Sequence, residues 1–187
     1  MYIIGITGPV GSGKTTIAKQ IETIFGDVSI LSMDNYFKAY SNLSLEDRKK
    51  INFDDPKTYD IDLLLSDIDK LKRNETIHMP IYSFEKYERT QETQEVLPRR
   101  VLVIEGFACL HNKRLRDLLD YSIFVNIDEI TQIKRLIDRN IKDRCRSLND
   151  VLMQYVKNIQ KSNNKFCMPQ MKYADLVIDG SVRNQIF

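Results

Sequence analysis

The chain has 187 residues and a formal net charge of +2, with 42% hydrophobic and 29% charged residues. This size and balance predict one domain over residues 1–187 with a sizeable core, and they exclude a disordered chain. No apolar run approaches the length of a membrane span, no signal peptide is visible at the N-terminus, and the small net charge does not by itself indicate a nucleic-acid partner.

The three cysteines, Cys109, Cys145 and Cys167, are far apart and include no C-x-x-C pair. An odd number at this spacing supports neither a disulfide framework nor a zinc site. Reduced thiols in a cytoplasmic protein are the simplest interpretation.

The first predicted element is an apolar, β-branched strand over residues 2–7, as expected of a buried parallel strand. Residues 8–15, GPVGSGKT, follow it and match the pattern G-x-x-x-x-G-K-[ST] at every fixed position. Apolar residues at helical spacing then predict a helix over residues 14–25. The order of strand, glycine loop and helix favours a phosphate-binding loop over a glycine-rich turn without a ligand.

The loop predicts a nucleotide ligand with magnesium. Its glycines let successive backbone N–H groups approach phosphate oxygens, and the N-terminus of the next helix points at the same anion. Lys14 is expected to reach the outer phosphates and Thr15 to offer its hydroxyl to the metal ion. The residues predicted to hold the donor nucleotide are Gly8, Gly11, Ser12, Gly13, Lys14, Thr15 and Thr16.

A second strand is predicted over residues 28–32, and Asp34 follows it. Parallel α/β sheets place ligands at the carboxyl ends of their strands, so Asp34 is a candidate catalytic group. An aspartate that forms a turn or caps a helix is the alternative. Residues 41–50 are polar, residues 51–60 combine acids and aromatics around Pro56, and the apolar spacing then predicts an amphipathic helix from residue 61 to about 73.

From about residue 75 to 98 the pattern changes to short β-like segments, 76–84 and 93–97, which predict a small hairpin insertion. Its aromatic residues Tyr82, Phe84 and Tyr87 are typical of a pocket wall for a flat ring. They are equally consistent with a small core belonging to the insertion itself.

The apolar segment 100–106 predicts a strand that ends in Glu105. In phosphate-loop proteins an acid at this kind of strand end lies beside the metal ion, so Glu105 is the candidate metal-side carboxylate. Two more strands are predicted over residues 121–127 and 174–179. Five strands alternating with helices indicate an α/β fold with a doubly wound parallel sheet.

Two helices are predicted between the last two strands, over about residues 129–143 and 148–162. The segment that begins with the first of them is rich in basic side chains: Lys134, Arg135, Arg139, Lys142, Arg144 and Arg146. One interpretation is a lid over residues 129–147 that closes positive charge over a transferring phosphoryl group. The other is a solvated helix with local ion pairs such as Lys134–Asp138 at i,i+4 spacing.

Taken together, these motifs resemble the uridine kinase family of P-loop kinases. The resemblance covers nearly the whole chain and rests on seven segments, residues 5–8, 34–38, 52–56, 80–84, 104–106, 139–146 and 172–175. It implies a P-loop NTPase-type five-stranded sheet with a helical lid. It also implies transfer of the γ-phosphoryl group of ATP to the 5′-hydroxyl of a pyrimidine nucleoside, with magnesium and without a covalent intermediate.

The resemblance also implies roles for individual residues. Asp34 takes the position of the catalytic base, assisted by Lys14 and Arg139 in stabilising the transferring phosphoryl group. Arg139 belongs to the lid together with Arg144 and Arg146, which would contact the nucleotide. On the acceptor side the implied substrate-binding residues are Asp34, Asp54 for the ribose hydroxyls, Tyr82 and Phe84 as a wall of the base pocket, Tyr87, and Gln154.

The chain departs from the family pattern at three positions. Tyr87 stands where the family usually has a histidine, Leu136 where it has an arginine, and Asn140 where it has an acidic residue. Because a site built to hydrogen-bond its ligand discriminates steeply when a partner is missing, these changes bear on which acceptor is used.

Four interpretations of function therefore stay open. The first is a uridine or cytidine kinase, and the second is a related kinase for another riboside or a sugar phosphate. The third is a nucleotide-binding regulator without transfer chemistry, and the fourth and weakest is nucleic-acid binding through the basic helix. The presence of Asp34, Lys14, Thr15 and Glu105 together favours catalysis. The expected partner is a small nucleoside-like molecule rather than nucleic acid or membrane, and homo-oligomers occur often in the family.

Overall fold

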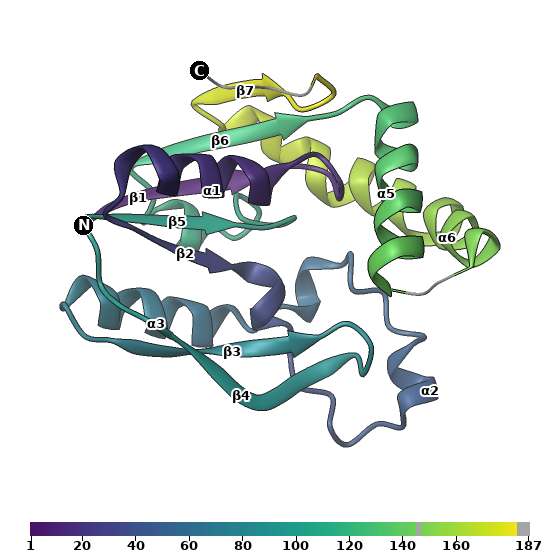
Figure 1. Cartoon of the computed structure of the whole chain (residues 1–187), viewed down its shortest axis with the longest axis horizontal. Coiled ribbons are helices and arrows are strands. Elements are labelled where there is room, and N and C mark those ends of the chain that lie inside the picture. The colour runs from purple at the N-terminus through teal and green to yellow at the C-terminus, as the bar shows by residue number, and fades with distance from the viewer. Residues whose placement is uncertain (145–146, 183–187) are drawn as a thin grey trace.

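A computed structural model of the protein describes residues 1–144 and 147–182, without the side chains of residues 142–144. Its centre is a five-stranded parallel sheet in the order β2-β5-β1-β6-β7 (Figure 1). The strands are β1 (Tyr2–Thr7), β2 (Val28–Ser32), β5 (Val101–Glu105), β6 (Tyr121–Asn126) and β7 (Leu176–Asp179). The predicted doubly wound α/β sheet is confirmed.

The central strands are buried on both faces, which explains their nearly continuous apolar sequence. On β5, Leu102 and Ile104 face one core cluster while Val103 faces the other. The register pairs Ile6 with Glu105, so that carboxylate lies beside the end of the strand that leads into the glycine loop.

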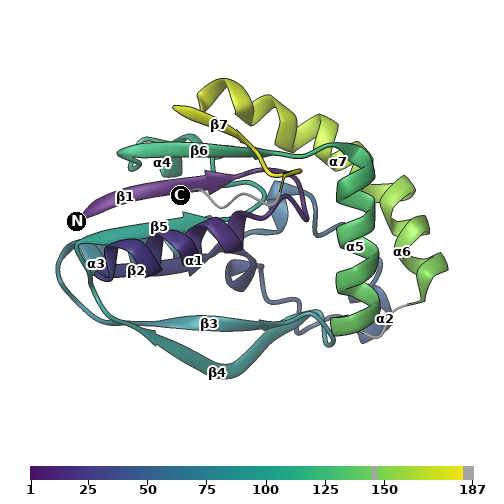
Figure 2. The same cartoon turned by 45° about the horizontal axis from the view of Figure 1, so that its top comes forward.

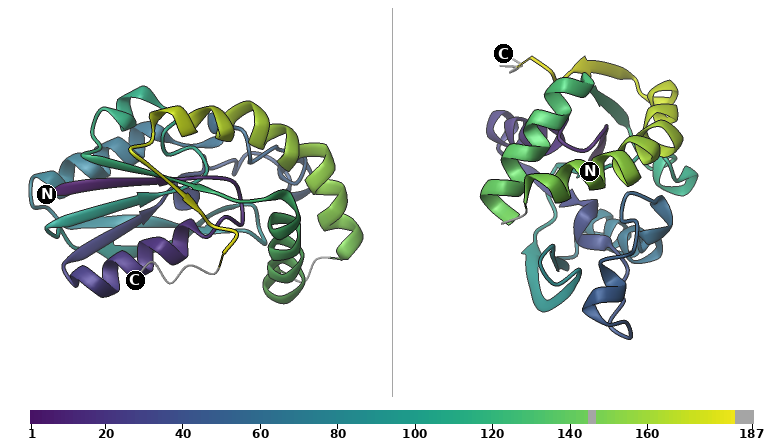
Figure 3. Two further views of the ribbon diagram at one scale, coloured as in Figure 1. Left: turned by 90° about the horizontal axis from the view of Figure 1, so that it is seen from above. Right: turned by 90° about the vertical axis from the view of Figure 1, so that its right-hand side faces the viewer.

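Helices cover both faces of the sheet, as Figure 3 shows. Helix α1 (Lys14–Phe25) packs Ile17 and Ala18 into the cluster that contains Val103, and it ends at Gly26, which has a positive φ of 70°. Helix α3 (Ile61–Lys72), capped by the side chain of Asp60, packs its buried face into the other cluster. Both helices follow the apolar spacing of their sequences.

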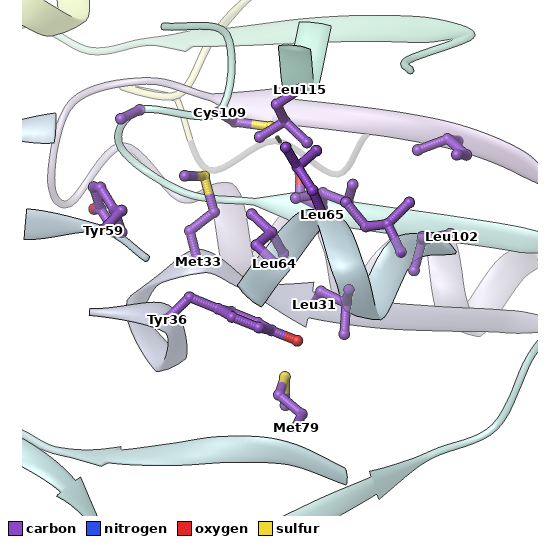
Figure 4. Close-up of a cluster of buried hydrophobic side chains, with 14 of the residues drawn as sticks. Leu31, Met33, Tyr36, Tyr59, Leu64, Leu65, Met79, Leu102, Cys109 and Leu115 are labelled. Carbon is purple, nitrogen blue, oxygen red and sulfur yellow. Dashed lines mark hydrogen bonds between the residues drawn. The ribbon is translucent and has the colours of Figure 1, made fainter. Parts of the chain in front are cut away.

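Strands β3 (Ile77–Ser83) and β4 (Glu88–Val96) form a separate two-stranded antiparallel sheet. Strand β4 begins at Glu88, not at Thr93, so the predicted start was wrong. In Figure 4, Met79 of this hairpin approaches Tyr36, which lies between the hairpin and α3. The Tyr36 hydroxyl donates to Asp67 Oδ2 at 3.1 Å. The hairpin thus shares its core with the face of the sheet.

The polar segment after β2 contains the short helix α2 (Leu45–Arg48), for which the sequence analysis predicted no element. The Ser44 hydroxyl accepts the Asp47 N–H at 3.2 Å and caps it. Arg48 forms an ion pair with Glu88 at the start of β4. This pair ties the segment to the hairpin. Short 3-10 turns also occur at Met33–Tyr36 and Pro56–Thr58.

The chain after β5 is mostly helical (Figure 2). Its helical elements are α4 (Lys113–Arg116), α5 (Glu129–Arg144), α6 (Leu148–Gln154), a π-helical turn Tyr155–Ile159, α7 (Gln160–Ser162), a second π-helical turn Asn163–Cys167 and a 3-10 helix Met168–Tyr173. The helical path therefore continues beyond the predicted end at residue 162. Among the helices of the described residues, none has the length and apolar character needed to cross a membrane.

One buried amide joins this helical path to the sheet. Gln170, 1% exposed, accepts the Leu110 N–H at 2.8 Å and the Thr7 hydroxyl at 3.0 Å. Its Nε2 donates to the carbonyl oxygens of Phe107 at 3.0 Å and Phe166 at 2.9 Å. Every polar atom of the amide is bonded, so its removal leaves several buried groups without partners.

We expect Gln170→Leu to lower the free energy of unfolding by about 2–4 kcal/mol, since an apolar side chain leaves the buried donors and acceptors around it without hydrogen-bond partners. Urea unfolding monitored by circular dichroism measures the change. Gln91→Leu, at an exposed position of β4, is the matched control and should change stability by no more than about 0.5 kcal/mol. Equal effects of the two variants would contradict the structural role of the Gln170 amide.

Candidate active site

A cleft of about 1310 Å³ opens at the carboxyl ends of the parallel strands. The glycine loop and the start of α1 line one side. The turn after β2, residues 51–54 and the hairpin line the second, and α5 and α6 line the third. This is the place where open α/β sheets bind their ligands.

The backbone of the loop adopts conformations that only glycine tolerates well. Gly8, Gly11 and Gly13 have φ angles of 149°, 82° and 104°. A Cβ on Gly8 would lie 2.2 Å from the Val125 carbonyl oxygen. Gly13 caps α1 without a side-chain hydrogen bond, which leaves the first-turn N–H groups available for an anion. The loop therefore fits a phosphate group.

Lys14 and Arg135 bring positive charge to the loop. Lys14 Nζ donates to the carbonyl oxygens of Gly8 at 2.9 Å and Pro9 at 3.0 Å. Arg135 on α5 reaches the carbonyl oxygens of Gly11 at 3.3 Å and Ser12 at 3.4 Å. The sequence analysis placed Arg135 only on a basic helix face, so its contact with the loop is a finding of the structure.

Glu105 and Thr15 meet at the bottom of the cleft. The Thr15 hydroxyl donates to Glu105 Oε1 at 3.2 Å. Burial, and then the charge of Asp34, raise the pKa of Glu105, which is 5% exposed. Within the described residues no cluster of three or more histidine, cysteine or acidic side chains forms a metal site. One carboxylate and one hydroxyl fit magnesium, which commonly takes its remaining oxygen ligands from phosphates and water.

Tyr59 lies among three carboxylates, a role that no sequence motif indicated. Its hydroxyl is 3.5 Å from Asp34 Oδ1, and the side chain is 3% exposed. Burial raises the pKa of Tyr59 well above its usual value, and the charges of Asp34, Asp54 and Glu105 add to the effect. The phenol therefore stays protonated and acts as a hydrogen-bond donor toward the candidate base.

The turn that carries Asp34 is held by the hairpin. Asn35 Oδ1 accepts the Tyr82 N–H at 3.2 Å, and Arg89 donates to the Tyr36 carbonyl oxygen at 3.4 Å. Arg89 also pairs with Asp60 at 3.1 Å. The position of the candidate base thus depends on contacts with residues far along the chain.

Aromatic rings cover the side of the cleft that the hairpin and residues 51–54 form. Phe37 stacks on Tyr59 with 4.6 Å between the ring centroids, and it contacts Tyr82 edge-on with 5.0 Å between centroids. The centroids of Tyr82 and Phe84 are 5.4 Å apart. The Tyr82 ring is 6% exposed, and its hydroxyl has no hydrogen-bond partner among the described residues. Phe37, Tyr59 and Tyr82 belong to the main core cluster and also line the cleft. Phe84 is 37% exposed and lines the cleft outside that cluster.

Tyr87 lies at the bend of the hairpin with a positive φ of 52°. This backbone conformation is uncommon for a bulky residue, and such conformations are found most often at functional sites. Its ring is 5.8 Å from that of Phe53, and both residues line the cleft.

Leu136, one of the departures from the family pattern, is a packing residue. It is buried with Val151, Tyr155 and Ile159 and joins α5 to the following helix. Asn140, another departure, donates from Nδ2 to the Leu136 carbonyl oxygen at 2.8 Å. The position of the family arginine is thus part of the helix interface that borders the cleft.

Most of the predicted site residues meet in this cleft. Those that line it are Gly11, Ser12, Gly13, Lys14, Thr15, Thr16, Asp34, Asp54, Tyr82, Phe84, Tyr87, Glu105, Arg139 and Gln154. Gly8 lies at the base of the loop and does not line the cleft. The side chain of Arg144 and all of Arg146 lie outside the part of the chain that the structure describes.

Arg139 Nε is buried and has no hydrogen-bond partner among the described residues. The Lys134–Asp138 ion pair does not form among the described side chains. Arg139 lines the cleft, while its i,i+4 neighbour Asp143 has a side chain outside the described part of the chain.

The comparisons with known proteins agree with this geometry. The model of the phosphoribulokinase / uridine kinase family matches residues 3–186. The chain belongs to this family. It is 40% identical over 186 residues to a uridine kinase of Listeria welshimeri and 38% identical over 186 residues to a uridine kinase of Clostridium novyi. Each alignment covers 98% of this chain and 89% of the relative.

A solved structure, the D-glycerate 3-kinase of Cryptococcus neoformans, is similar in fold, with a TM-score of 0.70 and 17% identity. The match covers 96% of this chain and 86% of that one. Membership in the phosphoribulokinase / uridine kinase family makes the protein a phosphotransferase that acts on a hydroxyl group, and it implies ATP as the phosphoryl donor. The prediction of an ATP-binding kinase of the uridine kinase family is confirmed.

We expect Glu105→Gln to raise the free energy of unfolding near neutral pH. Because the folded-state pKa of Glu105 is raised, the folded protein binds a proton there more tightly than the unfolded chain does. Ionisation therefore costs stability above the folded pKa, and the cost disappears as the pH falls through the ordinary glutamate range. Urea unfolding across this range should show the gain of the variant shrinking with falling pH.

Glu75→Gln is the control for this measurement. Glu75 is exposed, and a hydrogen bond from Arg73 lowers the pKa of its carboxyl. Its replacement should bring no gain near neutral pH. A loss of stability in Glu105→Gln near neutral pH would contradict the inferred cost of the buried charge.

Proposed function

We propose that the protein transfers the γ-phosphoryl group of ATP to the 5′-hydroxyl of a pyrimidine nucleoside, uridine or cytidine. The single observation that carries the proposal is the position of Asp34, which shares one cleft with the phosphate loop and with an aromatic acceptor pocket. The sequence identity of 40% and 38% to relatives named uridine kinase supports the proposal.

The donor half of the cleft would hold the phosphates. The N–H groups of the loop and the N-terminus of α1 bind the phosphate oxygens, and Lys14 leaves its loop carbonyls to pair with them. Thr15 and Glu105 are the residues that would hold magnesium, which neutralises phosphate charge when it is bound. Arg139 would bring further positive charge to the transferring group.

Asp34 would accept the hydrogen bond of the acceptor hydroxyl, orient it toward the γ-phosphate and take its proton. Tyr59 donates to the same carboxylate and holds it in place. Because no covalent intermediate forms on the protein, positioning and electrostatic stabilisation would supply most of the rate acceleration.

The acceptor half would hold the nucleoside. The rings of Tyr82, Phe84 and Tyr87 offer a surface for a flat base, Asp54 would accept hydrogen bonds from the ribose hydroxyls, and Gln154 would contact the nucleoside from α6. A phosphate-bearing acceptor such as a sugar phosphate is the second candidate. The cationic side chains of Lys49 and Lys157, which also line the cleft, favour it.

We further propose that residues 129–147 act as a lid of a single kinase domain spanning residues 1–187, and that the protein works in the cytoplasm. Cys109 and Cys167 support a reducing location, because both are buried and outside any disulfide. Burial raises the pKa of each thiol to about 12, so neither is a reactive thiolate at neutral pH.

An acceptor survey tests the proposal. ATP consumption is measured with uridine, cytidine, purine nucleosides, other ribosides and sugar phosphates at matched concentrations. We expect uridine or cytidine to give the largest acceptor-stimulated turnover. A clear preference for a sugar phosphate would replace the nucleoside assignment, and no stimulated turnover with any compound would refute the small-molecule kinase itself.

We expect Asp34→Asn to lower turnover by about 10²–10⁴-fold, because an amide cannot take the acceptor proton. Affinity for ATP should change little, since the phosphate loop is intact. Steady-state turnover and equilibrium nucleotide binding measure the two effects. Asp69→Asn, at an exposed position of α3, is the control, and near-normal turnover of Asp34→Asn would show that another group acts as the base.

We expect Tyr87→His to change the ratio of kcat/KM for uridine to that for cytidine by roughly tenfold, about the effect of one altered hydrogen bond. An imidazole is smaller than a phenol, presents a ring nitrogen as donor or acceptor, and tolerates the positive φ of this position better. Tyr2→His, at an exposed tyrosine of β1, is the control. An unchanged ratio would mean that Tyr87 does not contact the base edge.

A further inference from the structure

A buried glutamine of α5, Gln132, donates a hydrogen bond to a backbone carbonyl of the phosphate loop. A loop that turns its N–H groups toward a ligand turns carbonyl oxygens away from it, and those carbonyls need partners. Gln132 Nε2 donates to the Val10 carbonyl oxygen at 2.8 Å, the shortest of the bonds from α5 to this loop. Gln132 is 3% exposed and comes 122 positions after Val10 in the chain.

Two further side chains bond the other end of this amide. Gln132 Oε1 accepts Asn163 Nδ2 at 3.2 Å and the Tyr155 hydroxyl at 3.3 Å. The Tyr155 hydroxyl also lies 3.1 Å from Glu129 Oε1, so it is shared, whereas Asn163 Nδ2 is directed to Gln132. A primary amide has one accepting and one donating end. Donors on Oε1 therefore turn Nε2 toward Val10.

The orientation of the Gln132 amide is fixed because its two donor partners, Tyr155 and Asn163, are buried and keep their protons. Tyr155 and Asn163 are both buried. Burial, followed by the hydrogen bond to Glu129, raises the pKa of Tyr155 to about 12. The phenol thus remains a donor near neutral pH, and a reversed Gln132 amide would face two donors with its own NH₂ group.

The two donors come from the helix that borders the acceptor half of the cleft. Tyr155 opens the first π-helical turn and Asn163 opens the second. Such turns are frequent at functional sites because they re-aim side chains within a helix. Gln154 and Asn158 of the same helical stretch line the cleft. Figure 1 shows α5 standing between α1 and α6.

We propose that Gln132 is a positioning residue for the phosphate loop, oriented by Tyr155 and Asn163, and that this amide couples the acceptor-side helix to the donor site. The inference rests on the ATP-binding part of the proposed function and is independent of the acceptor. Gln132 does not line the cleft. It acts through the Val10 carbonyl and hence through the geometry of the loop.

Gln132→Glu tests the role at almost constant size. Tyr155 and Asn163 can still donate to the carboxylate, while its second oxygen faces the Val10 carbonyl oxygen and repels it. We expect the Kd of a fluorescent ATP analogue, measured without acceptor, to rise about tenfold or more, as for one lost buried hydrogen bond. The KM for the acceptor should change much less, and thermal unfolding should show a folded protein.

Gln160→Glu is the matched control. Gln160 Nε2 donates to Glu129 Oε1 at 2.8 Å. This change therefore also removes a hydrogen bond from a side-chain amide to α5, at an exposed position away from the loop. It should leave nucleotide affinity unchanged. Equal weakening by both variants would show a general loosening of the helices and overturn the proposal, as would an unchanged Kd in Gln132→Glu. Failure of the unaltered protein to bind the analogue would refute the proposed function instead.

Asn163→Asp tests the orienting step. A carboxylate facing Gln132 Oε1 should turn the amide around and break its bond to Val10, so nucleotide affinity should fall although residue 163 does not touch the loop. The losses in Gln132→Glu and in the double variant should be similar, because both act on one bond. Additive losses would contradict the coupling. If Asn163→Asp does not fold, Tyr155→Phe, which removes one donor, should give a smaller loss in the same direction.

Discussion

The structure depends on one constraint, the tight backbone of the phosphate loop. A Cβ on Gly8 would lie 2.2 Å from the Val125 carbonyl oxygen, and one on Gly180 would lie 2.2 Å from that of Ser12. The loop is therefore enclosed by β6, by the segment after β7 and by α5. This enclosure leaves no room for a Cβ at Gly8 or at Gly180.

The two halves of the cleft differ in chemistry. One half combines backbone N–H groups of the glycine loop with Lys14, whereas the other combines aromatic rings with carboxylates. Glu105 and Asp34 both line the cleft, and burial, followed by the charge of Asp34, raises the pKa of Glu105. A bound magnesium ion, as proposed for this site, would offset the cost of ionising this buried acid.

Local patterns predicted those parts of the fold whose cause is local. The apolar runs of β1, β5 and β6 marked buried strands because both faces of the sheet are covered. The prediction failed at β4, whose polar and mostly exposed residues are held as a strand by pairing with β3. Helix α2 was also missed; its serine cap is local, whereas the ion pair of Arg48 with Glu88 joins it to a distant strand.

The sequence alone determined the loop motif, the order of the strands along the chain and the positions of Asp34 and Glu105 at strand ends, since each follows from contiguous residues. Only the tertiary structure decided the order of the strands in the sheet, the place of Tyr59 among three carboxylates and the contact of Gln132 with Val10. These depend on contacts between residues far apart in the chain, and no local pattern specifies which distant groups satisfy a buried carbonyl or hydroxyl.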